Sequence, residues 1–362
     1  MIALPQDVAF IIHKIEKAGF EAFAVGGCIR DSLLSRTPND WDITTSALPE
    51  QVKALFPHTI DTGIKHGTVT VMCHHVGYEV TTYRIDGEYE DGRHPKQVVF
   101  TPSLIEDLKR RDFTINAMAY NDSRGLVDAF EGQQDLQKGV IRAVGEPEKR
   151  FSEDALRIMR AVRFAAQLGY TIEEETEAAM RRLSDTLTKI SAERIQVELV
   201  KLLVSDHPGH MKILYETGIT KVILPEFDRM METEQNNPHH LYSVGMHTIR
   251  AMEEVPADKV LRLTMLFHDM GKPAKKTTDA EGIDHFHGHA ELSAKMAKEI
   301  LQRLKFDNDT IGKVTKLVKN HDRKIIPQAK YVRRALCDLG EEIFLRLLEV
   351  KHAAVSYTHL TL

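Results

Sequence analysis

The stretch that decides the fold runs from residue 22 to residue 45 and reads AFAVGGCIRDSLLSRTPNDWDITT. Its apolar start predicts a strand at 22–25, and the helical spacing at 28–34 predicts a helix, so Gly26 and Gly27 lie at a strand-to-helix turn. Glycine lets backbone N–H groups approach an anion, and a helix N-terminus adds a partial positive charge. With Arg30 one turn into the helix, this turn is a candidate phosphate-binding site.

Two aspartates follow in the same stretch. Asp40 and Asp42 precede the β-prone residues at 43–45, and on a strand both carboxylates would project from one face, about 7 Å apart. Such a pair can hold two metal ions. Trp41, the only tryptophan in the chain, would face the core and anchor the strand. Either half alone is more often structural, but together they indicate a site.

The composition bounds the class of protein. A chain of 362 residues suggests two or three domains. The formal net charge is −5, so nucleic-acid binding would need a local basic surface. The three cysteines lack Cys-x-x-Cys spacing, which argues against a disulfide framework or a thiolate zinc site. With no apolar run of about 18 residues and no leader pattern, the expectation is a reduced cytoplasmic enzyme without membrane contact.

The periodicity changes once along the chain. Helices are expected at 6–18 and 49–56, strands at 22–25, 41–45, 68–73 and 78–83, a short helix at 113–120, and a closing strand and helix at 126–142. Gly145 and Pro147 mark the expected end of this part. From Ser152, a plausible N-cap, the pattern is helical. Ser191 reads as a helix start and Leu224-Pro225 as a helix stop.

The polar stretch 84–96 reads as a mobile loop, and 236–240 reads as a linker.

Six blocks in order carry a resemblance to a known family. After the opening stretch come TGIKHGTVTV at 62–71, YEVTTYR at 78–84, RRDFTINA at 110–117, EDALR at 153–157 and SAERI at 191–195. Together they resemble the polymerase-β-like nucleotidyltransferases, specifically the bacterial tRNA nucleotidyltransferase and poly(A) polymerase family. The resemblance implies an α+β fold. A head with a mixed β-sheet would be followed by an all-α neck and body and an all-α HD domain.

The resemblance also implies an activity: template-independent addition of CCA to tRNA 3′ ends from CTP and ATP. Two Mg²⁺ ions on Asp40 and Asp42 would activate the RNA 3′-hydroxyl and stabilise the leaving pyrophosphate. Glu79 is a candidate third metal carboxylate, with a cross-strand partner for Lys or Arg as the equal alternative. The implied nucleotide-binding residues are Gly26, Gly27, Arg30, Arg111, Asp112, Asn116, Asp154, Arg157, Arg160 and Arg163. The pattern of Asp86, Asp91 and Arg93 in the 84–96 loop resembles the family element that helps switch from C to A addition, which argues mildly against a CC-only enzyme.

Asp154 and Arg157 have a chemical use of their own. At i,i+3 on a helix they lie together. The Watson–Crick edges of C and A both pair an amine donor with a ring-nitrogen acceptor, whereas U and G offer the reverse. A carboxylate and a guanidinium therefore fit C and A and leave unpaired groups against U and G. Such a mismatch can discriminate by about 10⁴ or more.

The C-terminal third resembles the HD phosphohydrolase module, with LFHDMGK at 266–272 as its most specific stretch. The implied metal ligands are His247, His268, Asp269, His289 and His321, a donor set that suits a second divalent transition metal. The family completes this site with an Asp from a later helix, and Lys351-His352-Ala353-Ala354 does not supply one. The ending at 355–362 resembles a translated adapter, so the HD domain is expected to be truncated.

The expected domains are the head at 1–145, the neck and body at 146–232, the HD domain at 233–354 and a non-native tail at 355–362. Alternative functions remain open. The chain could be an A-adding, CC-adding or poly(A) polymerase relative, an HD phosphohydrolase acting on cyclic or 2′-phosphates, or a non-catalytic RNA-binding protein. The intact Asp-x-Asp and Glu-Asp-x-x-Arg motifs count against the last.

Overall fold

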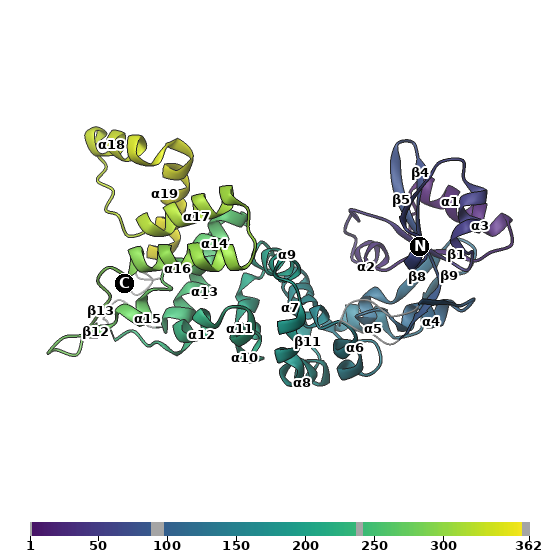
Figure 1. Cartoon of the computed structure of the whole chain (residues 1–362), viewed down its shortest axis with the longest axis horizontal. Coiled ribbons are helices and arrows are strands. Elements are labelled where there is room, and N and C mark those ends of the chain that lie inside the picture. The colour runs from purple at the N-terminus through teal and green to yellow at the C-terminus, as the bar shows by residue number, and fades with distance from the viewer. Residues whose placement is uncertain (1, 88–97, 237–241, 357–362) are drawn as a thin grey trace. The chain divides into compact units, whose positions relative to one another are not determined.

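The computed structural model describes residues 2–87, 98–236 and 242–356 (Figure 1). The chain divides into two compact units: unit 1 comprises Met1–Arg157 with Tyr170–Leu183, and unit 2 comprises Ile158–Gly169 with Ser184–Leu362. The predicted linker at 236–240, apart from Asn236, and the predicted tail from 357 on lie outside the described residues, as do Asp91 and Arg93.

Unit 1 is built on a mixed seven-stranded sheet in the order β3-β4-β5-β2-β1-β8-β9. The β2–β5 pair is parallel and the other neighbouring pairs are antiparallel. The strands are β1 Ala22–Val25, β2 Asp42–Thr45, β3 Thr59–Gly63, β4 Thr68–Cys73, β5 Val76–Thr82, β8 Met118–Asn121 and β9 Gly125–Asp128. Two small pairs accompany the sheet: β6 Arg84–Asp86 with β7 Val98–Phe100, and β10 Val140–Ile141 with β11 Thr171–Ile172.

Unit 1 also contains several short helices. They are α1 Gln6–Lys17, α2 Gly27–Leu33, α3 Pro49–Leu55, α4 Leu104–Lys109, α5 Gly132–Lys138, α6 Pro147–Glu153 and α8 Glu174–Leu183, with 3₁₀ turns at Ile64–His66 and Thr114–Asn116. Helix α1 packs its buried residues Val8, Ile11, Ile12 and Ile15 against β1 and β2. This apolar face follows the i, i+3, i+4, i+7 spacing of the sequence. Phe23 of β1 packs with Tyr83 and Leu108 in a fully buried core.

The described residues of unit 2 form helices and one two-stranded pair. After α7 Leu156–Leu168, which begins in unit 1, come α9 Ala192–Leu203, α10 Met211–Glu216, α11 Ile219–Ile223, α12 Pro225–Glu232, α13 Val244–Glu254, α14 Lys259–Phe267, α15 Lys272–Lys275, β12 Thr277–Thr278, β13 Asp284–His285, α16 His289–Arg303, α17 Asn308–Asn320, α18 Ala329–Leu339 and α19 Glu341–Ser356. Further 3₁₀ turns lie at Ser184–Lys189 and Pro208–His210. Helices α14, α16, α17 and α19 pack together.

The α+β fold class is confirmed, and four local expectations are wrong. Residues 84–86 of the predicted loop form strand β6, which pairs with β7. The segment 113–120 is a 3₁₀ turn followed by strand β8, because Met118–Asn121 is drawn into the sheet beside β1. Trp41 is half-buried rather than a core residue, since it precedes β2 instead of lying within it. Ser152 lies inside α6, and the next helix starts only at Leu156.

None of the helices in the described part of the chain combines the length and the apolar character needed to span a bilayer.

Candidate nucleotide and metal sites

The turn between β1 and α2 has the conformation that its glycines predicted. Gly26 adopts φ 85° and ψ −130°, a region that side chains rarely enter. Its N–H donates to the carbonyl oxygen of Met118 at 3.1 Å, which fixes the turn to strand β8. A Cβ atom on Gly26 would lie 3.0 Å from Nη1 of Arg111. The arginine from a distant segment therefore rests directly on the turn.

A chain of hydrogen bonds joins this turn to the RRDFTINA segment. Arg30 Nη1 donates to Oδ1 of Asn116 at 2.8 Å, and Asn116 Nδ2 donates to Oδ1 of Asp112 at 3.2 Å. The same Asp112 oxygen accepts the N–H of Phe113 at 2.8 Å. Arg30 Nη2 lies 3.7 Å from the Cβ position of Gly27. The structure thus brings together six of the predicted nucleotide-binding residues.

The two aspartates lie at the start of β2. Asp42 is its first residue and Asp40 precedes it; both are exposed. Although the Asp42 side chain reaches solvent, surrounding protein atoms desolvate its carboxyl and raise its pKa. Repulsion from Asp40 and Glu79 raises this pKa further, whereas Arg111 opposes the rise. Ile43 pairs with Val80, so Asp42 and Glu79 are the preceding neighbours on parallel strands. This concentration of negative charge is the donor set that a divalent cation would neutralise.

Asp107 was missed by the sequence analysis. Its carboxylate is fully buried and accepts from Arg110 Nε at 2.9 Å and from Thr44 Oγ1 at 3.1 Å. It also forms an ion pair with Arg111 Nη2 at 3.5 Å. Burial alone would raise the pKa of Asp107, but the two arginines hold it below the usual value. Its i,i+3 and i,i+4 spacing to Arg110 and Arg111 was the available signal.

The α6–α7 junction places Arg157 differently from the expectation. Its Nη1 donates to Oε2 of Glu153 at 2.7 Å, and its Nη2 donates to the carbonyl oxygen of Arg110 at 3.0 Å. Asp154 has extended backbone angles, and its carboxylate accepts the N–H of Leu156 at 3.0 Å. The charge partner of Arg157 is therefore Glu153, whereas the sequence spacing predicted Asp154.

Arg160 and Arg163, the last two of the implied nucleotide-binding residues, lie in unit 2. Arg163 is buried, and its Nε donates to Oε2 of Glu198 at 2.8 Å. Its guanidinium carbon lies 3.5 Å from the ring centroid of Phe164, and that of Arg160 lies 5.3 Å from the same ring. Arg163 is thus engaged by a buried carboxylate, which sequence spacing could not reveal.

The HD histidines converge on one carboxylate. The Nε2 atoms of His268, His289, His247 and His321 lie 3.2, 3.3, 3.6 and 3.6 Å from the oxygens of Asp269. Two groups of three have ligand atoms close enough to share a metal ion: His247, His268 and Asp269, and Asp269, His289 and His321. His268 and Asp269 follow α14 at its C-terminal end rather than lying inside it.

Backbone carbonyls orient the imidazoles of this cluster. The Nδ1 atoms of His268, His289 and His321 lie 2.7, 2.8 and 2.7 Å from the carbonyl oxygens three residues earlier. A carbonyl oxygen only accepts, so each Nδ1 is the donor and each Nε2 is left to face Asp269. The Nε2 atoms of His289 and His321 lie 3.2 Å apart. Two lone pairs at that distance repel unless a proton or a metal ion lies between them, so the cluster could hold a metal.

The pKa values of the cluster depend on its burial and on the contacts to Asp269. His268 Nε2 is buried and makes no well-aligned hydrogen bond within the described residues, although an oxygen of Asp269 lies 3.2 Å away. Burial alone would raise the pKa of Asp269, but His268 and Lys272 hold it well below its usual range. Burial lowers the pKa of His321; for His289 the hydrogen bond to Asp269 outweighs burial and raises it.

Two lysines border the cluster. Lys272, which the sequence analysis did not single out, is buried and pairs with Oδ2 of Asp269 at 2.8 Å. Its i+3 position after Asp269 was the signal. Lys351 Nζ on α19 donates to the carbonyl oxygen of His321 at 3.3 Å. Helix α19 thus brings an ammonium group next to the cluster.

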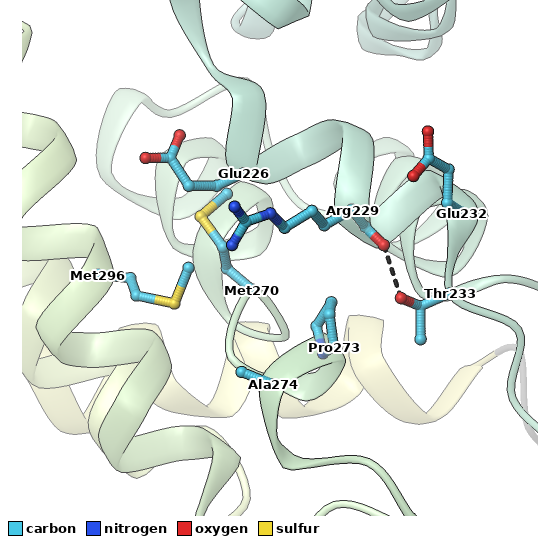
Figure 2. Close-up of a pocket in the computed structure, with 8 residues that line it drawn as sticks. All are labelled: Glu226, Arg229, Glu232, Thr233, Met270, Pro273, Ala274 and Met296. Atoms are coloured by element: carbon cyan, nitrogen blue, oxygen red, sulfur yellow. Dashed lines mark hydrogen bonds between the residues drawn. The ribbon is translucent and has the colours of Figure 1, made fainter.

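A hollow of about 370 Å³ lies beside the HD segment (Figure 2). Figure 2 shows the side chain of Arg229 reaching from α12 toward Met270, the residue after Asp269. The Thr233 hydroxyl donates to the carbonyl oxygen of Arg229 at 2.6 Å. The lining residues are Glu226, Arg229, Glu232, Thr233, Met270, Pro273, Ala274 and Met296. The hollow is distinct from the metal cluster, since it is lined by none of the five proposed ligands.

Comparisons with known proteins match three successive parts of the chain. Residues 22–142 match the poly A polymerase head domain, residues 169–231 match the probable RNA and SrmB-binding site of polymerase A, and residues 239–353 match the HD domain. Fold and sites therefore define a poly(A) polymerase-type nucleotidyltransferase head joined to an RNA-binding segment and an HD domain.

Relatives narrow this class to one family. The crystal structure of Bacillus stearothermophilus CCA-adding enzyme in complex with CTP is similar with a TM-score of 0.75 and 32% identity, covering 96% of this chain and 77% of that one. The chain belongs to the family of bacterial CCA-adding enzymes.

Two curated relatives are more similar over a shorter range. The CCA-adding enzymes of Leuconostoc mesenteroides and Lactiplantibacillus plantarum are each 55% identical, over 204 and 221 residues. Those matches cover 56% and 61% of this chain and 51% and 53% of the relatives. The chain therefore spans about half the length of the curated relatives that it matches.

Proposed function

We propose that this chain adds C, C and A to tRNA 3′ ends from CTP and ATP without a nucleic-acid template. The observation that carries the proposal is the convergence on the Gly26 turn. Arg111 rests on the turn and acts electrostatically on Asp42, and Arg30 is bonded to Asn116. One anion-binding turn, two arginines and an aspartate pair are the parts that nucleotidyl transfer requires.

Each group has a role in this proposal. The Gly26–Gly27 turn and Arg30 hold the triphosphate, Arg111 neutralises charge on it, and Asp112 and Asn116 contact the sugar. Asp40 and Asp42 would hold Mg²⁺, which when bound polarises the reacting phosphate and lowers the pKa of the attacking hydroxyl. Glu79 adds negative charge beside Asp42. The role of this chain is thus to position the reactants and to balance their charge.

Base selection is assigned to Asp154 and Arg157. The guanidinium of Arg157 is held by Glu153 and by the Arg110 carbonyl, so it is oriented before a base arrives. A fixed donor and a carboxylate match C and A and leave U and G with unpaired groups. Exchanging Glu153 for Gln should therefore relax selection against UTP while CTP and ATP still bind. We propose that Arg160 contacts the RNA end, whereas Arg163 is engaged by the buried Glu198.

The rest of the assignment follows the sequence boundaries. We propose a head at 1–145, a neck and body at 146–232 that contacts tRNA, and an HD domain at 233–354. A cytoplasmic location is consistent with three cysteines that are all free.

Gel-resolved extension of a tRNA that ends at its discriminator base tests the main proposal. CTP, ATP or both would be supplied with Mg²⁺. The Asp40→Ala, Asp42→Ala variant should lose all extension. The Asp61→Ala, Asp122→Ala variant removes two exposed carboxylates elsewhere in the same unit and should keep it. Addition of only C or only A, or of a long A tail, would reassign the chain to a partial-adding or poly(A) polymerase relative.

A second function is proposed for the HD domain: metal-dependent hydrolysis of cyclic or 2′-phosphates. It is supported by the four Nε2 atoms that face Asp269. A divalent transition metal, when bound there, supplies Lewis-acid activation of water. The buried Lys272 forms an ion pair with Asp269 and stabilises its charged form.

Hydrolysis of a 2′,3′-cyclic nucleotide with Mn²⁺, Co²⁺ or Ni²⁺ tests this second function. Asp269→Ala should abolish it, whereas the Asp40→Ala, Asp42→Ala variant should retain it. Loss in both variants would show that hydrolysis also depends on the aspartate pair, which contradicts an independent HD activity. No hydrolysis with any of the three metals would remove the proposal.

A further inference from the structure

A second hollow in unit 2 is lined by lysines. Its volume is about 560 Å³, and its lining comes from α15, α16 and α17. Four of the lining residues are Lys275, Lys295, Lys298 and Lys319, and the one acidic residue among them is Glu291. Glu291 pairs with Lys319 at 3.0 Å. Within the described residues the other three lysines form no ion pair, so this lysine groove carries a net positive charge.

The groove contains a polar atom that lacks a partner. Thr315 lines the groove, and its hydroxyl oxygen is buried without a hydrogen-bond partner among the described residues. A buried hydroxyl without a partner costs free energy, so the groove wall at Thr315 is not fully satisfied by its own neighbours. The floor also includes the apolar side chains of Leu292 and Ala294. A lining of four lysines and one glutamate suits the negatively charged phosphates of a nucleic-acid strand.

The groove lies next to the histidine–aspartate cluster. Gly288 lines its end, and the next residue, His289, faces Asp269. Lys319 lies two residues before His321. From residue 288 to residue 298 helix α16 rises by about 15 Å, which is longer than one phosphate group. A linear run of phosphates fits this length, with one end next to the cluster.

We propose that the lysine groove binds the phosphodiester backbone of a single RNA strand and leads its end toward the His–Asp cluster. The chain as a whole carries a net charge of −5, so RNA binding requires local basic surfaces, and this groove is one of them. The choice of RNA rests on the tRNA substrate proposed above. The groove itself adds a contact that neither the head nor the RNA-binding segment supplies.

Binding of a fluorescent single-stranded RNA dodecamer to the full chain tests the groove. The Lys295→Ala, Lys298→Ala variant removes two exposed lysines on α16, where alanine is tolerated. Two lost contacts on single-stranded RNA should reduce the slope of log K against log salt by about 1.4. At 0.1 M salt this corresponds to about 25-fold weaker binding. The Lys324→Ala, Lys330→Ala variant removes two exposed lysines outside the groove and should bind like the wild type.

A second readout locates the contact. Mass spectrometry after lysine acetylation should show protection of Lys295 and Lys298 by the dodecamer. Protection by inorganic phosphate but not by RNA would identify a site for free phosphate and overturn the RNA proposal. Unchanged affinity, slope and protection would overturn it as well. Extension of tRNA by the same preparations reports separately on nucleotide addition, so failure of that function is distinguishable from failure of the groove.

Discussion

Replacing Gly26 by alanine tests the phosphate turn most directly. At φ 85° and ψ −130° a side chain is strained, which costs about 1–3 kcal/mol of folding free energy. The new Cβ would also lie 3.0 Å from Nη1 of Arg111, so the guanidinium must shift by a few tenths of an ångström. Because misplacement by about 1 Å can cost 100-fold in rate, we expect kcat/KM for CTP and ATP to fall by about 10- to 100-fold.

Gly19→Ala is the matched control. Gly19 has φ 90°, and nothing lies within 4 Å of its Cβ position. Both variants should lose comparable stability in urea unfolding, but only Gly26→Ala should lose nucleotide addition. Wild-type kcat/KM in Gly26→Ala, or an equal loss in Gly19→Ala, would refute the claim that the turn positions Arg111 for the nucleotide.

Three further outcomes are expected. Asp107→Asn should lower the free energy of unfolding in urea by about 3–5 kcal/mol, because Arg110 and Arg111 then lose their fully buried counter-charge. Because the pKa of Asp107 is lower in the folded than in the unfolded protein, its carboxylate stabilises the fold above the unfolded pKa of about 4. This contribution is lost as the pH falls through the folded pKa, so Asp107→Asn should lose less stability on acidification than the wild type. Glu198→Gln should lower the free energy of unfolding by a similar amount, because Arg163 loses its buried counter-charge. If the variant unfolds at the same urea concentration as the wild type, the pair has no structural role. Mn²⁺ at 100 times its Kd should stabilise the wild type by about 2.7 kcal/mol in thermal unfolding. His289→Ala should abolish this stabilisation, whereas substitution of the exposed His287 by alanine should not. Equal stabilisation of all three proteins would exclude the cluster as the Mn²⁺ site.

Short-range sequence signals predicted much of the fold. The strand-turn-helix at 22–34 follows from a short apolar run, two glycines and helical spacing, all of which act within a few residues. Segment 113–120 was predicted as a helix because its apolar content is high. The sheet overrides that local preference by pairing Met118–Asn121 with β9 and β1. Likewise Ser152 has the chemistry of an N-cap, but α6 already includes it.

The sequence predicted the residue types of the candidate sites, because carboxylates, arginines and histidines at characteristic spacings indicate their chemistry. It did not predict which residues pair with them. The i,i+4 spacing of Asp107 and Arg111 was visible, but not that Asp107 becomes a fully buried counter-charge. Glu198 becomes a counter-charge for Arg163 through a contact between segments that spacing does not relate. Nor does spacing state that Nδ1 of His321 is taken by a carbonyl, which leaves Nε2 for the cluster. The sequence determined which groups are present and the local turns that carry them. Only the tertiary structure decided which charges are buried together, because desolvation and pairing depend on neighbours that are distant along the chain.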